Sequence, residues 1–367
     1  MSKVLFLVNH EIVIYNFRLE LVERMLADGH TVVISSPPGE LIDRLVAMGC
    51  QHRPVEFRRR SVNLMDEAWL YMVYRKLLKE EKPDFVLTYT IKPNIYGGLA
   101  CARKGIPYVE TVAGLGSAVE KKSWMQSAAL CLYRRALRGA QRVFFQNTEN
   151  LALFEKKKIA QGKRVLLPGS GVNLQRYTAL PYPADDTVEF VYFSRIMKEK
   201  GIAQYLEAAE YIRARHPQTR FHICGFCEEA YEERLRELHA RGVIVYHGML
   251  RDVKTVLAQT HCTIHPTYYP EGLSNVLLES AACARPLIAT DRSGCREVVD
   301  DGQNGFLIRQ MDAADLIRKI ERFLALPWED RRRMGLASRS KVEREFDRQI
   351  VVERVMQELM LIQQHAE

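Results

Sequence analysis

The stretch "CTIHPTYYPEGLSNVLLE" (262–279) decides the fold. Its first six residues form an apolar run typical of a buried strand, and residues 273–284 have the spacing of a helix. An acid, a glycine and polar Ser274 lie between the two. Because a strand followed directly by a helix is the repeating unit of a parallel sheet, the same pattern should recur along the chain.

Two series of strand-like runs alternate with helical patterns such as residues 15–28, 66–81 and 201–215. The first series is 3–9, 31–36, 84–90, 107–112 and 142–147, and the second is 188–194, 220–225, 243–248, 262–267 and 286–290. This alternation predicts an α/β fold of two doubly wound, Rossmann-like domains, with ligands outside the carboxyl ends of the strands.

A Gly- and Pro-rich stretch, "LPGSGVNLQRYTALPYPADD" (167–186), separates the two series and has the composition of an interdomain linker. We therefore expect domains at 1–175 and 185–340, facing a cleft between them. The tail 331–363 predicts two helices without a strand, and residues 341–367 are assigned to a separate C-terminal segment.

The composition limits the classes of partner. The chain has 367 residues, 47% of them hydrophobic, and a formal net charge of +8 with a pI of about 9.0, which favours phosphates or an anionic membrane over neutral partners. We find no zinc-finger, RNP or helix-turn-helix pattern, so nucleic acid is not expected. Eight scattered cysteines and no signal-like or membrane-spanning run favour a cytoplasmic protein.

The turn after the strand at 262–267 has the features of an anion site. Backbone N–H groups of Gly272, Leu273 and Ser274 would lie at a helix N-terminus, which suits a phosphate. Glu271 precedes the helix, and Glu279 lies about two turns inside it, where a carboxylate could hold the two hydroxyls of a ribose. An ordinary helix with solvated acids remains an alternative.

The turn "FSRIMKEKG" (193–201) follows the first strand of the second series. It places Arg195 and Lys200 at the carboxyl edge of the same sheet, where both cations could reach a diphosphate. A solvated basic loop is the alternative interpretation.

Arg195, Lys200, the E-x7-E of Glu271 and Glu279, and the stretch "ARPLIATDRSGCREVVDDGQNGFLI" (284–308) together resemble the retaining GT-B glycosyltransferases of family 4. The resemblance implies an acceptor-binding domain at 1–175, a UDP-sugar-binding domain at 185–340, and a C-terminal helix at 341–367 that packs back on the first domain. It also implies that Arg195 and Lys200 hold the donor diphosphate, Glu279 the ribose and Glu271 the sugar, which makes Glu271, Arg195 and Lys200 the catalytic candidates.

The first domain departs from the family at one loop. The stretch "ETVAGLGSAVE" (110–120) lacks the histidine that many members carry there, and its Gly114 and Gly116 form a bare loop. Together with "TYTIKPNIYGG" (88–98), which contains Lys92, the loop resembles the branch that acts on polyprenyl-diphosphate-linked saccharides. His10, in the first strand–helix loop, is a further candidate for the acceptor side, or a structural polar residue.

The stretch "KKSWMQSAALCLYRRALRG" (121–139) mixes basic, apolar and aromatic residues. It could lie on anionic lipid, or it could be a core helix with a solvated basic face.

The sequence thus predicts a retaining enzyme that moves a hexose or N-acetylhexosamine from a UDP-sugar to a polyprenyl-diphosphate-linked saccharide. We expect it at the inner face of the membrane, peripherally bound, with no metal or other cofactor, because no D-x-D follows a strand. A UDP-sugar epimerase and a non-catalytic nucleotide-sugar-binding protein are the alternatives. The sugar, linkage, acceptor, acceptor-activating residue and oligomeric state are not specified by the sequence.

Overall fold

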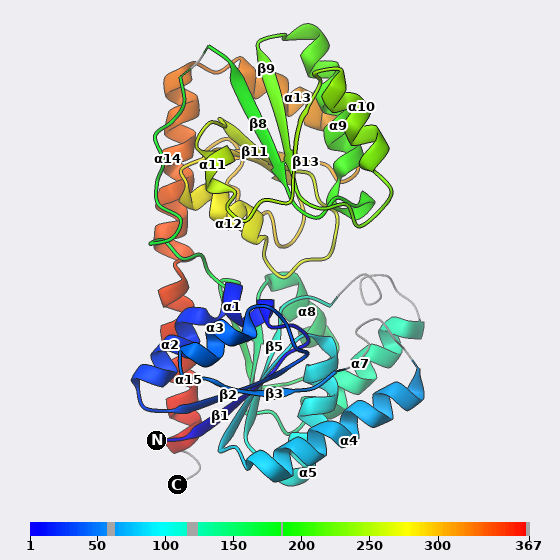
Figure 1. The fold of residues 1–367 in the computed structure, drawn as a ribbon, viewed down its shortest axis with the longest axis vertical. Coiled ribbons are helices and arrows are strands. Elements are labelled where there is room, and N and C mark those ends of the chain that lie inside the picture. The colour runs from blue at the N-terminus through cyan, green and yellow to red at the C-terminus, as the bar shows by residue number, and fades with distance from the viewer. Residues whose placement is uncertain (57–62, 116–123, 185, 365–367) are drawn as a thin grey trace. The chain divides into compact units, whose positions relative to one another are not determined.

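A computed structural model describes residues 1–56, 63–115, 124–184 and 186–364 of the chain. It divides into two units. Unit 1 comprises residues 1–170, 270–272 and 348–367, and unit 2 comprises residues 171–269 and 273–347. Each unit is an α/β layer structure around its own parallel sheet (Figure 1).

The sheet of unit 1 has seven parallel strands in the order β3-β2-β1-β4-β5-β6-β7. They are β1 (Lys3–Leu7), β2 (Thr31–Ser36), β3 (Gln51–Pro54), β4 (Phe85–Tyr89), β5 (Tyr108–Val112), β6 (Arg142–Phe145) and β7 (Arg164–Leu166). The order reverses between β1 and β4, which defines a topological switch point at the carboxyl ends of these two strands.

Helices cover both faces of this sheet. One face packs against α1 (Ile12–Phe17), α2 (Leu19–Ala27), α3 (Ile42–Ala47) and α15 (Arg348–Gln364). The other face packs against α4 (Leu64–Glu81), the π-helix η1 (Pro93–Gly97), α5 (Gly98–Lys104), α7 (Trp124–Ala136) and α8 (Thr148–Lys156). The helix predicted at 15–28 is broken at Arg18, whose φ of −139° ends α1 and begins α2.

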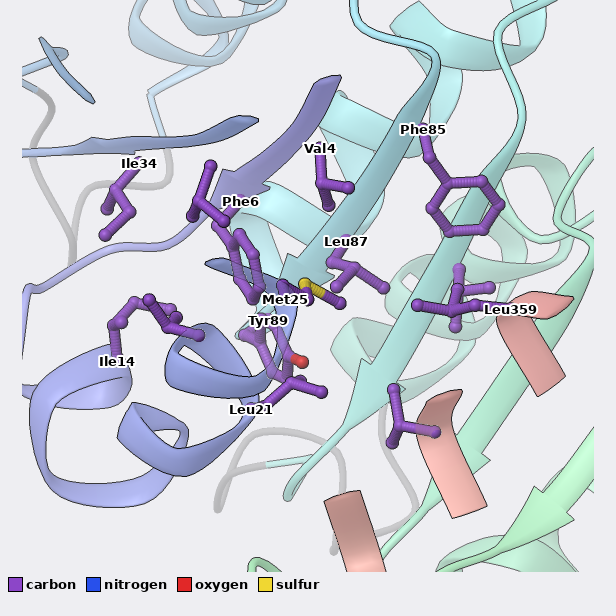
Figure 2. Packing of buried hydrophobic residues seen from close by; sticks show 14 of the residues in the cluster. Val4, Phe6, Ile14, Leu21, Met25, Ile34, Phe85, Leu87, Tyr89 and Leu359 are labelled. Carbon is purple, nitrogen blue, oxygen red and sulfur yellow. The ribbon is translucent and has the colours of Figure 1, made fainter. Parts of the chain in front are cut away.

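The core of unit 1 joins the sheet to the C-terminal helix. Figure 2 shows Phe6 and Leu87 of the central strands near Met25 of α2, with Leu359 of α15 close to Phe85. An ion pair of 3.0 Å between Arg348 and Glu20 of α2 holds the start of α15, with both side chains only 10% exposed. Burial of the apolar side chains between the sheet and these helices is the main contribution to the stability of unit 1.

The sheet of unit 2 has six parallel strands in the order β10-β9-β8-β11-β12-β13. They are β8 (Val188–Phe193), β9 (Thr219–Cys224), β10 (Val245–Gly248), β11 (Cys262–His265), β12 (Leu287–Thr290) and β13 (Gly305–Ile308). Its switch point lies between β8 and β11.

The helices of unit 2 also lie on both faces of its sheet. One core contains α9 (Ile202–Arg215), α10 (Glu232–Ala240) and α13 (Ala313–Leu324). The other contains α11 (Lys254–Leu257), α12 (Asn275–Ala282) and α14 (Trp328–Glu345). The doubly wound α/β fold predicted for both domains is therefore confirmed.

The prediction of individual elements is confirmed for all ten strand-like runs and for the two C-terminal helices, α14 and α15. It misses β3, β7 and β13, each of which is a short edge strand of its sheet. Among the described residues, no helix is both long and apolar enough to cross a membrane.

Candidate functional site

Arg195 and Lys200 lie in the turn that follows the carboxyl end of β8, at the switch point of unit 2. Lys200 ends the short 3-10 helix η2 (Lys198–Lys200) and is only 7% exposed. Gly201 follows with φ +77°, and a Cβ there would collide with the carbonyl oxygen of Pro266. The close approach of this turn to the segment after β11 therefore requires glycine.

The segment after β11 supplies an aromatic ring to both cations. The centroid of the Tyr269 ring lies 5.3 Å from Cζ of Arg195 and 4.9 Å from Nζ of Lys200. Both distances fall within the range of cation–π attraction. Tyr269 thus brings together the two cations that the sequence predicts to act together, and it is a residue that the sequence analysis missed.

Backbone contacts fix the loops that carry this cluster. The Tyr268 N–H donates to the Glu199 carbonyl oxygen at 2.8 Å, and the guanidinium of Arg292 donates to the Tyr268 carbonyl oxygen. The first bond joins the turn after β8 to the segment after β11, and the second joins that segment to the turn after β12 (Leu287–Thr290).

Glu228 is the anionic neighbour of Arg195. Its carboxylate accepts a hydrogen bond from Nη1 of Arg195. Partial burial lowers the pKa of Arg195, but the Glu228 carboxylate and Tyr269 together outweigh this effect, and the net pKa is raised above the ordinary value. The guanidinium therefore stays charged and oriented.

Ser274 is the N-cap of α12, as its position after a strand and before a helix suggests. Its side chain accepts a hydrogen bond from the Leu277 N–H, and its own N–H donates to the Gly294 carbonyl oxygen at 2.8 Å. The expectation that the Ser274 N–H is available to a phosphate is therefore wrong, because a backbone carbonyl already uses it. Leu273 is 6% exposed, with its side chain in the core.

Glu279 lies on α12, half-buried, beside Tyr177 from the segment that follows residue 170. Burial and the neighbouring Glu279 carboxylate, to which the Tyr177 hydroxyl is hydrogen-bonded, raise the pKa of Tyr177. A ribose that binds Glu279 would therefore share the carboxylate with the hydroxyl of Tyr177.

Glu271 and Gly272 cluster with unit 1. The side-chain Nδ2 of Asn147 donates to the carbonyl oxygens of Glu271 at 3.0 Å and Gly272 at 2.7 Å. A Cβ on Gly272 would collide with the Ala113 carbonyl oxygen, so only glycine fits this close approach. Asn147 was not singled out from the sequence; its only signal is its position at the end of a strand run.

The candidates in unit 1 follow different strands. His10 follows β1, with Nδ1 2.7 Å from a carboxylate oxygen of Glu11. Lys92 follows β4 and forms an ion pair of 2.7 Å with Glu67 of α4, with both side chains under 16% exposed. His10 and Lys92 thus flank the switch point of this sheet.

Gly114 follows β5, and a Cβ there would lie 3.4 Å from both the Gly272 nitrogen and the Pro270 carbonyl oxygen of the same unit. Gly116 lies outside the described residues, as do residues 121–123 of the basic stretch at 121–139.

The arrangement in unit 2 can bind an anion with two charges. Two cations on one ring, at the switch point of a doubly wound sheet, present positive charge where such sheets bind phosphate groups. Two doubly wound α/β domains in one chain are the architecture of the GT-B class of glycosyltransferases.

The chain belongs to the glycosyltransferases of family 4. Residues 3–147 match the family model "Glycosyl transferase 4-like", and residues 182–341 match "Glycosyl transferases group 1". The resemblance noted from the sequence is therefore confirmed, and the protein is a glycosyltransferase.

Two relatives and two solved structures illustrate the similarity. N,N'-diacetylbacillosaminyl-diphospho-undecaprenol alpha-1,3-N-acetylgalactosaminyltransferase of Campylobacter jejuni is 23% identical over 94% of both chains. UDP-Gal:alpha-D-GlcNAc-diphosphoundecaprenol alpha-1,3-galactosyltransferase of Escherichia coli is 23% identical over 72% of both chains.

A glycosyltransferase from Rickettsia africae has the same fold, with a TM-score of 0.81, 20% identity and 97% of both chains covered. Alr3699/HepE of Anabaena, solved in complex with UDP, has a TM-score of 0.79 at 17% identity, with 98% of this chain and 99% of that chain covered.

Proposed function

We propose that this glycosyltransferase transfers a hexose or N-acetylhexosamine from a UDP-sugar to a polyprenyl-diphosphate-linked saccharide, in the assembly of a surface polysaccharide or glycan. The observation that carries the donor half of the proposal is the pair Arg195 and Lys200, held on one side by Tyr269 at the switch point of unit 2. The names of the relatives from Campylobacter jejuni and Escherichia coli support the acceptor half.

In this proposal Arg195 and Lys200 stabilise the negative charge that develops on the leaving diphosphate. The N-terminus of α12 adds a partial positive charge. Glu271 contacts the donor sugar and Glu279 the ribose. The reaction proceeds with retention by front-face displacement, in which the departing diphosphate helps to deprotonate the acceptor hydroxyl.

We propose that no metal ion is needed on the diphosphate. Arg195 and Lys200 together carry two positive charges, equal to one divalent cation. Lys200 is buried and Arg195 is half-buried, so each interaction with an anion is stronger there than in water.

The acceptor would bind in unit 1, near the carboxyl ends of β1, β4 and β5, where His10, Lys92 and Gly114 lie. Since the acceptor carries a polyprenyl chain, we propose that the enzyme works as a cytoplasmic protein bound peripherally to the inner face of the membrane. Anionic lipid would attract the net charge of +8.

One experiment separates this function from its alternatives. The protein is incubated with several UDP-sugars, with and without a short-chain polyprenyl-diphosphate saccharide, and the release of UDP and the fate of the sugar are followed. Sugar transfer and UDP release only in the presence of acceptor support the proposal. Epimerised UDP-sugar without acceptor identifies an epimerase, and tight UDP binding without turnover identifies a sensor; either result refutes transfer.

A further inference from the structure

The helix α4 exposes large apolar side chains over its first half. Leu64, Met65, Trp69 and Met72 are 84%, 78%, 45% and 58% exposed. Met65, Trp69 and Met72 are four and three residues apart, which places them on one face of the helix. Exposed apolar groups concentrated in this way mark an interaction site.

The fold of unit 1 does not require this outer face. The opposite face of α4 supplies Leu70, Tyr74, Leu77 and Leu78 to the core, and each is at most 7% exposed. The helix is therefore anchored by its inner face, while the apolar outer face contributes nothing to the packing of the core.

The same outer face becomes basic in the second half of the helix. Lys76 and Lys79 continue the spacing of Met72, and Arg75 lies beside them; all three are exposed. Glu80 neutralises part of this charge through a distant ion pair of 3.8 Å with Lys76. An apolar half with a tryptophan followed by a cationic half complements the acyl boundary and the anionic head groups of a bilayer.

The start of α4 lies at the edge of the sheet where an acceptor would bind. Glu67, on the inner side of its first turns, pairs with Lys92 at 2.7 Å, directly after β4 at the switch point. Glu67 is also hydrogen-bonded to the hydroxyl of Tyr96 in η1. The exposed stripe is thus tied to the carboxyl edge of the sheet, and Figure 1 shows α4 along the side of this unit next to α5.

We propose that the outer face of α4 is the surface by which the enzyme lies on an anionic lipid bilayer. Met65, Trp69 and Met72 enter the acyl boundary, and Lys76 and Lys79 lie among the head groups. This inference rests on the proposed lipid-linked acceptor, whose saccharide would reach the sheet edge beside Lys92.

The sequence suggested residues 121–139 as the membrane-binding surface, whereas this inference assigns that role to α4. Within residues 125–136 of α7, Met125 is the large apolar side chain that is exposed, at 45%. Arg134 donates to the Lys157 carbonyl oxygen, so part of the basic face is engaged within the protein. The described part of α7 therefore offers less apolar surface than α4.

The first test is flotation of the full chain with vesicles of phosphatidylcholine, with and without phosphatidylglycerol. We expect the wild type to float with anionic vesicles. The triple variant Met65→Ser, Trp69→Ser, Met72→Ser should bind at least about tenfold more weakly. Met249→Ser with Met311→Ser, which removes two exposed methionines of unit 2 at 71% and 63% exposure, is the matched control and should float like the wild type.

The contribution of the basic half is tested separately. Lys76→Ser with Lys79→Ser should weaken binding to anionic vesicles and reduce its dependence on salt, with little effect on neutral vesicles. Quenching by brominated lipid should fall in Trp69→Phe relative to the wild type, because Trp69 is the aromatic residue at the boundary.

Activity distinguishes a failure of this inference from a failure of the proposed function. The triple variant should match the wild type on a short-chain acceptor in solution and should be slower on a long-chain acceptor embedded in vesicles. Wild-type flotation of the triple variant overturns the role of α4, whatever the activity. A wild type that does not float but forms a dimer broken by the triple substitution assigns the face to a second copy of the chain and also overturns it. If the wild type is inactive on the soluble acceptor, the proposed function is refuted. The flotation experiment still tests whether the outer face of α4 binds the bilayer.

Discussion

Replacing Tyr269 with leucine should weaken the binding of UDP. The Tyr269 ring lies about equally far from Arg195 and Lys200, at 5.3 and 4.9 Å. Each such contact contributes about 0.5–1 kcal/mol at a partly exposed site. Because the ring holds the two like charges together before a diphosphate binds, a protein without it must spend binding free energy on bringing them together. This loss should be about 1–2 kcal/mol, or about five- to thirtyfold in Kd.

Calorimetric titration of UDP into wild type and Tyr269→Leu measures this loss directly. Tyr269→Phe is the matched control, since it keeps the ring face and removes only the hydroxyl next to Arg195. Thermal unfolding of all three proteins shows whether the half-buried position tolerates each change. Competition by uridine, which has no phosphate, should be the same in all three.

Three results would refute the reasoning. Tighter UDP binding in Tyr269→Leu would mean that the ring competes with the diphosphate for the cations. An equal loss in Tyr269→Phe would assign the effect to the hydroxyl. A parallel loss for uridine would mean that Tyr269 contacts the nucleoside, and not only the two cations.

Four further predictions concern the donor, the metal and pH. Glu279→Ala should weaken UDP binding about tenfold or more, as loss of a charged bidentate contact does, and unchanged affinity in calorimetry would exclude the ribose role. Glu271→Ala should nearly abolish turnover and leave UDP affinity close to that of the wild type; a folded variant that keeps its rate, or loses UDP, contradicts this. Activity should survive excess EDTA, and Mg²⁺ should not rescue Lys200→Ala, whereas a metal-restored wild type would reopen the search for a metal site. Burial raises the pKa of Glu110 well above its ordinary value, so its contribution to stability is complete below about pH 4.5 and is lost as pH rises through the raised pKa. The difference in free energy of unfolding between wild type and Glu110→Gln should therefore shift against the wild type with rising pH in denaturant titrations, and a pH-independent difference counts against a buried neutral acid.

Except for the half-buried edge strand β10, the strands that the sequence predicted are buried on both faces. Such strands are continuous apolar runs, for example "KVLFL" of β1, with four of five residues fully buried. β3 ("QHRP") and β7 ("RVL") have no fully buried residue and lie at the two edges of their sheet. An edge strand is stabilised by pairing on one side and needs no apolar run, which explains why β3 and β7 were missed. This reason does not apply to β13 ("GFLI"), an apolar edge strand that is mostly buried and was missed as well.

Glu110 is a second feature that the sequence could not specify. It lies in β5 within a run predicted as a strand, but nothing in "PYVETV" says that its side chain points to the covered face. Neither of its carboxyl oxygens has a hydrogen-bond partner among the described residues. A Cβ on Gly98 would collide with this carboxyl, so the glycine and the acid depend on each other across helix and strand.

The sequence indicates that Arg195 and Lys200 lie near each other, but it does not reveal the contacts that they make. Arg195 and Lys200 are visible in the sequence because they follow a strand, and the carboxyl end of a strand is where ligands bind. Tyr269 lies 69 residues after Lys200 in the numbering of the chain. Its contact with the cations depends on β11 pairing directly with β8, and strand order is a property of the sheet that local patterns do not encode. The use of the Ser274 N–H by Gly294 was missed for the same reason.

The contacts of Arg195 and Lys200 also explain how two like charges can be kept together before a donor arrives. Held near one ring, the two cations repel each other. The electron-rich face of Tyr269 offsets this cost for both, and Glu228 offsets it for Arg195. None of these partners reaches the strength of a diphosphate, which carries more charge and more acceptor oxygens than a single carboxylate. Tyr269 and Glu228 thus favour keeping the two cations together before a donor binds, and in the proposed function a diphosphate then provides the stronger anionic partner.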